Sequence, residues 1–294
     1  MDMVDALANL LRVERLELNL FRGVSADIGR DHVFGGQILG QALMAAAATV
    51  DGRTAHSLHA YFLRPGDIHA PVLYDVERIR DGGSFSTRRV VAIQHGQPIL
   101  HTAISFQVGE PGLEHQAKMP EVPPPEVVRQ DPASLERILA RLDNRMREAL
   151  QYRSAFELRE VHPDLPAGRD GLEQHCIWLR PCGQLPDDPL LQQAALAYVS
   201  DFNLLQTAML RHEVCLGDDC MQVASLDHSM WFHQPVDFSD WLLYVTDSPR
   251  AGNARGFCRG SLFDRQGRLV ASVAQEGLVR DRRLRSPAAI IKNP

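Results

Sequence analysis

FGGQILGQALMAAAATV, residues 34–50, is the most distinctive stretch of this sequence. Apolar residues lie on nearly every side of a helix drawn through it, and small residues fill most of the other positions. A helix that is apolar all round is buried rather than laid on a surface. The stretch therefore predicts a helix enclosed by other elements, which the neighbouring sequence must supply.

Strand-like sequence surrounds this predicted helix. Four runs follow it, at residues 57–63, 72–79, 85–94 and 99–108. DGG at residues 81–83 is a typical turn sequence between two of them. Upstream, Leu16, Leu18 and Leu20 alternate with polar residues, which predicts a strand with one buried face. The order strand, helix, antiparallel strands indicates a sheet curved around the helix.

The second half of the chain repeats this order. VFGGQILGQAL (residues 33–43) aligns with VSDFNLLQTAM (residues 199–209), and the same register continues through the later strands. It predicts a second central helix with Asp201 at its start, opposite Gly35. A strand at residues 176–180 opens this copy. Repetition at a fixed register indicates a duplicated module.

We therefore predict an α+β fold of the double hot-dog type, with two modules that each wrap a curved antiparallel sheet around a central helix. Residues 1–110 form the N-terminal module, 111–170 a linker with an added helix, and 171–294 the C-terminal module. The linker contains PPP at residues 123–125, which suits neither regular helix nor central strand. Asp131 and Pro132 form an N-cap and first-turn pair for the added helix.

Composition narrows the function classes. The 294 residues are 45% hydrophobic and 23% charged, which suits a soluble globular chain, and the net charge of −6 argues against nucleic acid as a partner. Residues 1–11 predict a short amphipathic helix rather than a signal peptide, and no segment is apolar enough for membrane insertion. Five cysteines show no zinc-site spacing. We expect a cytoplasmic protein with no metal or cofactor.

No GxSxG, GxxxxGK[ST], GxGxxG or HExxH motif is present, so the informative residues are polar ones in apolar contexts. Asp201 is either a functional acid or an N-cap carboxylate. Gln275 interrupts the apolar face of a strand, and a buried amide needs partners, which favours a polar site. Ser225 lies just before the strand at residues 228–233, where its hydroxyl could be structural.

Histidines flank the paired strands of both modules and could act as general bases or as structural hydrogen-bonding groups. They are His56, His59, His228 and His233. The run Asp227-His228-Ser229 resembles a triad in print only. Neighbours on a strand point to opposite faces, so these three residues cannot form one.

Several segments together resemble the type II acyl-CoA thioesterases, which are double hot-dog enzymes. They are LFRG (20–23), VFGGQILGQAL (33–43), HSLHAYFLRPGD (56–67), RDGGSFSTRRV (80–90), LDHSMWFH (226–233), ARGFCRG (254–260) and VAQEGLVR (273–280). The resemblance implies that Asp201, Ser225 and Gln275 hold the water that hydrolyses the thioester directly, without an acyl-enzyme. Relatives often carry threonine where this chain has Ser225, and both residues supply a hydroxyl.

The same resemblance implies a fatty acyl-CoA substrate of medium to long chain, CoA as a product, and a homo-oligomer, dimer or tetramer. Because Gly35 and Ser105 occupy the places of Asp201 and Gln275 in the first module, one active centre per double module is expected. Backbone N–H groups at Gly35 and Gly36 are candidates to stabilise the oxyanion. The other candidates for contact with the substrate are His56, Arg64, Arg88, Arg89 and Arg255.

Two other functions fit the same fold. A hot-dog enoyl thioester hydratase would rely on a histidine, His56 or His228, in place of Gln275. A non-catalytic acyl-CoA sensor would also bind the substrate, and fold alone does not exclude it. A sensor is expected to carry an output segment such as a DNA-binding element, and none is visible in this sequence.

Overall fold

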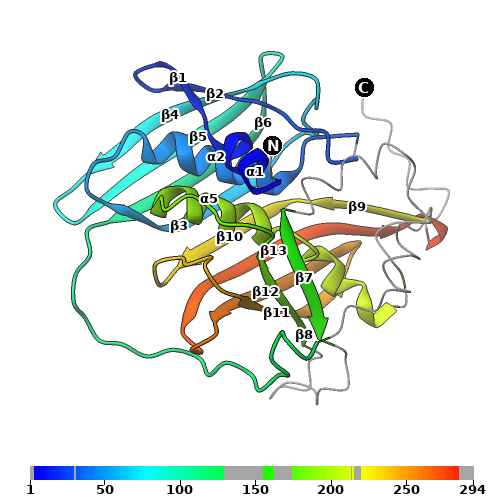
Figure 1. The fold of residues 1–294 in the computed structure, drawn as a ribbon. Helices are drawn as coiled ribbons and strands as arrows, with labels where there is room; N and C mark the ends of the chain where they lie inside the picture. The colour runs from blue at the N-terminus through cyan, green and yellow to red at the C-terminus, as the bar shows by residue number, and fades with distance from the viewer. Residues whose placement is uncertain are drawn as a thin grey trace.

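The computed structural model describes residues 3–29, 31–128, 155–161, 174–212, 214 and 220–284 (Figure 1). The strands of this part of the chain form one 13-stranded sheet, in which every pairing is antiparallel. The strand order is β1-β2-β4-β5-β6-β3-β10-β13-β12-β11-β8-β7, and β9 pairs with β13.

The N-terminal half contributes α1 (Met3–Leu11), β1 (Glu14–Glu17), β2 (Leu20–Gly23), α2 (Gly35–Ala47), β3 (Thr54–Phe62), β4 (Val72–Asp81), β5 (Phe85–Gln94) and β6 (Gln97–Gln107). The C-terminal half contributes β7 (Phe156–Val161), β8 (His175–Pro181), α5 (Pro189–Ser200), the short 3-10 helices η1 (Leu205–Ala208) and η2 (Leu210–His212), β9 (Met221–Ser225), β10 (Asp227–Phe232), β11 (Leu242–Gly252), β12 (Arg255–Asp264), β13 (Leu269–Asp281) and η3 (Arg282–Leu284).

The sheet is symmetric about the seam where β3 pairs with β10. His59 lies opposite Ser229 in this antiparallel pair. Moving outward, β6, β5, β4 and β2 on one side match β13, β12, β11 and β8 on the other. The two halves are visible in Figure 1 as the blue-to-cyan and the yellow-to-red parts of the sheet, with α2 and α5 between them. The predicted α+β double hot-dog fold is confirmed.

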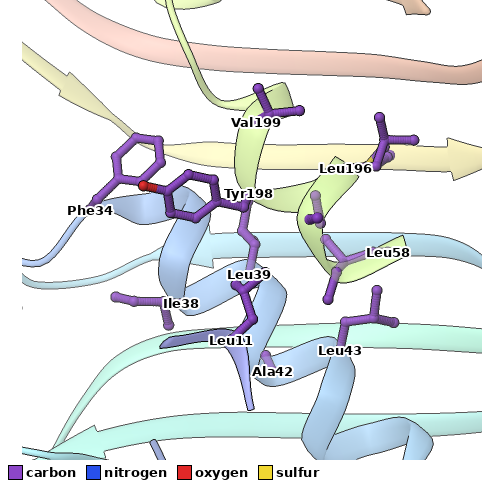
Figure 2. Packing of buried hydrophobic residues seen from close by; sticks show 14 of the residues in the cluster. Leu11, Phe34, Ile38, Leu39, Ala42, Leu43, Leu58, Leu196, Tyr198 and Val199 are labelled. Atoms are coloured by element: carbon purple, nitrogen blue, oxygen red, sulfur yellow. The ribbon is translucent and has the colours of Figure 1, made fainter. Parts of the chain in front are cut away.

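The two long helices approach each other closely because α2 has glycine at two successive turns. A Cβ atom on Gly36 would lie 2.3 Å from the carbonyl oxygen of Tyr198, and one on Gly40 would lie 2.9 Å from that of Ala194. Figure 2 shows side chains of both helices meeting in the core that this contact forms, among them Leu39 of α2. The predicted enclosed helix at residues 34–50 is confirmed as α2, with Phe34 as its N-cap.

The second central helix differs from its prediction. The helix α5 begins at Pro189, because the Asp188 side chain accepts hydrogen bonds from two backbone N–H groups of the first turn. It ends at Ser200, and Asn203 takes a left-handed φ of 57°, which turns the chain. Asp201 is therefore the C-cap of α5 rather than the first residue of a helix, and η1 occupies the expected helical register.

The predicted strand through Leu16, Leu18 and Leu20 is also wrong in part. A turn separates β1 from β2 here, and the Leu16 and Leu18 side chains are exposed. Both strands are only four residues long and form a hairpin at the edge of the sheet. The alternating leucines therefore run through a turn, and their spacing does not indicate the buried face of one strand.

The connection after β6 runs along the C-terminal half without helix or strand through residue 128, as its prolines predict (Figure 1). Met119 and Val122 pack against a second, smaller core on the outer side of that half. Trp178 of this core donates a hydrogen bond to the carbonyl of Pro123. The predicted helix that begins at residue 131 lies outside the described residues.

Candidate active site

Gln275 is the centre of a buried polar cluster in the C-terminal half. It lies on β13, and only 1% of its surface is exposed. Its Nε2 donates a hydrogen bond of 2.7 Å to Oγ of Ser225, the last residue of β9. The pairing of β9 with β13, which sets Ser225 opposite Gly277, positions this contact. Two of the three residues implied to hold water therefore lie together.

His228 contacts the oxygen end of the Gln275 amide. Its Nδ1 lies 2.6 Å from the amide oxygen of Gln275, and its Nε2 lies 3.0 Å from Oγ of Ser200 at the end of α5. The ring is fully buried. Burial lowers the pKa of His228 below its usual 6.5, although the Asp201 carboxylate and the Gln275 hydrogen bond oppose this shift. The ring is therefore neutral at neutral pH.

Asp201 joins this cluster to the other half of the molecule. Its Oδ2 accepts a hydrogen bond of 3.0 Å from the backbone N–H of Gly36, in the first turn of α2. A helix N-terminus stabilises negative charge through its free N–H groups and its dipole. A Cβ atom on Gly35 would lie 2.8 Å from the same oxygen, so glycine gives the carboxylate room. The Gly36 N–H predicted to hold an oxyanion is thus engaged by Asp201.

His56 lies in the N-terminal half rather than in this cluster. Its Nε2 is 2.8 Å from Oγ of Ser105, and its ring meets the edge of the Phe85 ring. Burial and the neighbouring His59 lower its pKa below 6.5. The predicted match of Ser105 with Gln275 is wrong by one residue, because Tyr61 pairs with His101 as its counterpart Trp231 pairs with Ser272, which places Ile104 at the position of Gln275. The N-terminal half therefore has a buried apolar residue where the C-terminal half has its amide.

The prediction that Arg88 contacts CoA phosphates disagrees with its position in the structure. Its side chain is 1% exposed, and its five N–H groups meet acceptors on Thr49, Arg80, Thr87 and Asp81. The guanidinium ties the end of α2 to the β4–β5 hairpin. It is a structural residue because no donor is left for a ligand.

The other three predicted arginines lie at the surface. Arg64 donates a hydrogen bond to the carbonyl of Pro98. Arg89 pairs with Glu77, and Arg255 pairs with Glu276, the residue after Gln275. Exposed ion pairs are weak, so a phosphate can replace either carboxylate at small cost.

Cys258 lies opposite Gln275 in the β12–β13 pair and is the nearest thiol in register. Burial raises the pKa of Cys258 to about 11, so the thiol is not a nucleophile at neutral pH. Among the described residues, no group of three or more His, Cys, Asp or Glu side chains is placed to hold a metal ion. None of the described helices is long and apolar enough to cross a membrane.

The fold is that of a double hot-dog protein, with a buried polar cluster beside the end of α5. A family model for "Acyl-CoA thioesterase" matches residues 144–278, and one for "Acyl-CoA thioesterase N-terminal domain" matches residues 24–107. Acyl-CoA thioesterase 2 of Haemophilus influenzae is 41% identical over 95% of this chain and 98% of its own length. Acyl-coenzyme A thioesterase 8 of Homo sapiens is 40% identical over 93% of this chain and 88% of its own.

Solved structures give the same result. The crystal structure of acyl-CoA thioesterase II TesB2 from Mycobacterium marinum is 41% identical and matches with a TM-score of 0.80, covering 94% of this chain and 98% of that one. This chain therefore belongs to the acyl-CoA thioesterase family, a class of hydrolytic enzymes.

Proposed function

We propose that this protein hydrolyses fatty acyl-CoA to a free fatty acid and CoA, with Asp201, Ser225 and Gln275 holding the attacking water. Family membership supports the reaction. The observation that carries the choice of residues is the buried Gln275 amide, which donates to Ser225 and contacts His228, the ring on which the charge of Asp201 acts. An apolar strand face has no need of such an amide, whereas a water-holding site does.

The proposed step needs no covalent intermediate. The Gln275 amide nitrogen carries two N–H groups; one meets Ser225, and the second is directed to the water. Asp201 accepts a proton as the water oxygen attacks the thioester carbonyl carbon. The carbon–sulfur bond then breaks, and the CoA sulfur takes the proton from Asp201. General-base assistance of this kind is worth about 100- to 10,000-fold.

Finer features of the substrate and setting belong to the same proposal. The rings of Phe34, Tyr198 and Phe202 meet one another beside Gly35 and Asp201, which suits a hydrocarbon chain, and we propose medium- to long-chain substrates. Arg64, Arg89 and Arg255 remain candidates for CoA phosphates.

We also propose a cytoplasmic homo-oligomer, a dimer or tetramer. The cysteines that the structure describes are all free thiols, as is usual in a reducing compartment. Tyr61 and Trp231 are exposed at the seam strands, and aromatic residues at a surface favour association.

The test is release of free thiol from a series of saturated acyl-CoAs of increasing length. Asp201→Asn is expected to lower kcat by about 100-fold or more, because it removes the base, and Gln275→Ala by about 100-fold. Ser225→Thr keeps the hydroxyl and is expected to retain most of the rate, unlike Ser225→Ala. Ser229→Ala on β10, whose hydroxyl meets His59 at the exposed seam, is the matched control.

Each variant is compared with the parent for its urea midpoint, so that loss of folding is separated from loss of chemistry. Full activity in folded Asp201→Asn contradicts the assignment of the base. A parent that releases no thiol but hydrates an enoyl-CoA is a hydratase, and one that binds acyl-CoA without turnover is a sensor.

A further inference from the structure

We infer that His228 is the positioning residue that fixes which end of the Gln275 amide faces Ser225, an inference that rests on the proposed function. His228 contacts Gln275 but is not one of the residues proposed to hold the water. Its two ring nitrogens contact Gln275 on β13 at 2.6 Å and Ser200 on α5 at 3.0 Å. His228 therefore connects the sheet to the helix that ends at Asp201.

The hydroxyl of Ser225 cannot choose the orientation of the amide by itself. A serine hydroxyl both donates and accepts, so it would meet either the nitrogen or the oxygen of Gln275 equally well. With the nitrogen toward Ser225, as the structure has it, the amide oxygen faces Nδ1 of His228. Two acceptors cannot share this contact, so Nδ1 must carry a proton.

The proton on Nδ1 is decisive because the ring holds only one. Burial keeps His228 neutral, while the charged groups that act on it are the carboxylates of Asp201, at the end of α5, and Asp227, on β10. A neutral ring with Nδ1 protonated has Nε2 as an acceptor. Oγ of Ser200 lies 2.9 Å from the Ala197 carbonyl oxygen and 3.0 Å from Nε2, so in this tautomer its single proton turns from the carbonyl to Nε2. In the opposite tautomer, Nδ1 accepts, and the Gln275 amide must turn over to donate to it.

Turning the amide over would remove the donor that the site requires. Its oxygen would then face Ser225 and the water, where it accepts an O–H of the water instead of donating to one of its lone pairs, so the water is no longer held with its other lone pair toward the thioester carbon. A shift of this kind needs no change of fold. The hydrogen bonds of His228 therefore affect the rate by orienting the Gln275 amide. Misplacing a group that positions a reactant can lower the rate about 100-fold.

A matched pair of substitutions separates the two ring nitrogens. The side-chain nitrogen of asparagine reaches about the place of Nδ1, so His228→Asn keeps a donor for the Gln275 oxygen and loses Ser200. Glutamine reaches about the place of Nε2, so His228→Gln keeps Ser200 and loses the donor. We expect His228→Asn to retain kcat within about tenfold and His228→Gln to lose about 100-fold, both with KM little changed.

The comparison is repeated in the Gln275→Ala background. If His228 acts through Gln275, His228→Gln has no further effect on kcat once the amide is absent, because the two changes are not additive. A purely structural role predicts equal losses in both variants and additive losses in the double variants. Either result overturns the inference.

A second readout does not depend on activity. In the full chain with nitrogen-15-labelled histidine, the resonance that disappears in His228→Asn identifies His228. We expect the signature of a neutral ring protonated at Nδ1, with an N–H resonance that shifts in Gln275→Leu. A ring protonated at Nε2 overturns the inference even if thioester hydrolysis is confirmed. The expected tautomer in a protein that releases no thiol would instead contradict the proposed function alone.

Discussion

Arg88 and Arg89 are neighbours in the chain with opposite structural roles. Arg88 is buried with all its donors in use, whereas Arg89 is exposed and paired with Glu77. Removing Arg88 leaves buried acceptors on Thr49 without partners, which costs about 1–3 kcal/mol. We expect Arg88→Met to lower the free energy of unfolding by about that amount, with KM for acyl-CoA unchanged in the folded protein.

Arg89→Met is the matched control, and urea unfolding is the measurement. An exposed substitution of this kind usually changes stability by less than about 0.5 kcal/mol. If Arg89 meets a CoA phosphate, its variant raises KM, and the two neighbours then report separately on stability and on binding. Equal stability of both variants would contradict the structural role of Arg88.

The residues of the site differed in how far the sequence could reveal them. Gln275 stands out because a polar residue falls on the buried face of a strand whose period is two, and the structure confirms that it is buried. His228 occupies a buried position of the same kind, yet its place behind Gln275 depends on β10 and β13 being neighbours. The contact of Asp201 with Gly36 joins residues 165 positions apart, which no local pattern encodes.

At the scale of elements, the contact between α2 and α5 depends on glycine. Alanine is favoured over glycine in a helix by about 1 kcal/mol, so Gly40→Ala would ordinarily stabilise α2. Here the added Cβ would lie 2.9 Å from the carbonyl of Ala194 and 2.6 Å from a methyl group of Leu11. Overpacking against a backbone typically costs about 1–3 kcal/mol, which outweighs the gain.

We therefore expect Gly40→Ala to lower the free energy of unfolding, measured in urea, while Gly83→Ala leaves it unchanged. Gly83 is the control because a Cβ there meets no atom within 4 Å. A more stable Gly40→Ala protein would show that α5 can move away from α2 at little cost.

The placement of α5 shows where prediction from sequence reached its limit among the elements. Most strands and α2 follow from apolar period and turn residues, and the structure confirms them within a few positions. The internal repeat predicted a second central helix with Asp201 at its start, but α5 lies upstream at Pro189–Ser200. Asp188 followed by Pro189 is a strong start signal and could have located it. The residues aligned with α2 therefore contain only the short helix η1, and the long helix of this half precedes them.

At the scale of the whole molecule, two similar modules have come to differ at their seam. The C-terminal half joins Gln275 to His228 and Ser225, while the N-terminal half has His56 paired with Ser105. Both histidines lie on the two strands, β3 and β10, that join the modules. The seam thus contains titratable groups where a simple sheet would have apolar contacts.

Burial lowers the pKa of both His228 and His56 below 6.5, and the sign of the effect on stability follows. Below pH 6.5 these two histidines bind protons more readily in the unfolded chain than in the folded protein, so the free energy of unfolding falls as pH falls. The free energy of unfolding is expected to be highest above pH 6.5 and to decline toward about pH 5, before the carboxylates with their lowered pKa values contribute. His228→Asn should flatten this slope whatever its effect on overall stability. Urea unfolding at about pH 7.5 and about pH 5 measures it, and equal slopes in parent and His228→Asn would mean that the seam histidine gains its proton as readily when folded as when unfolded.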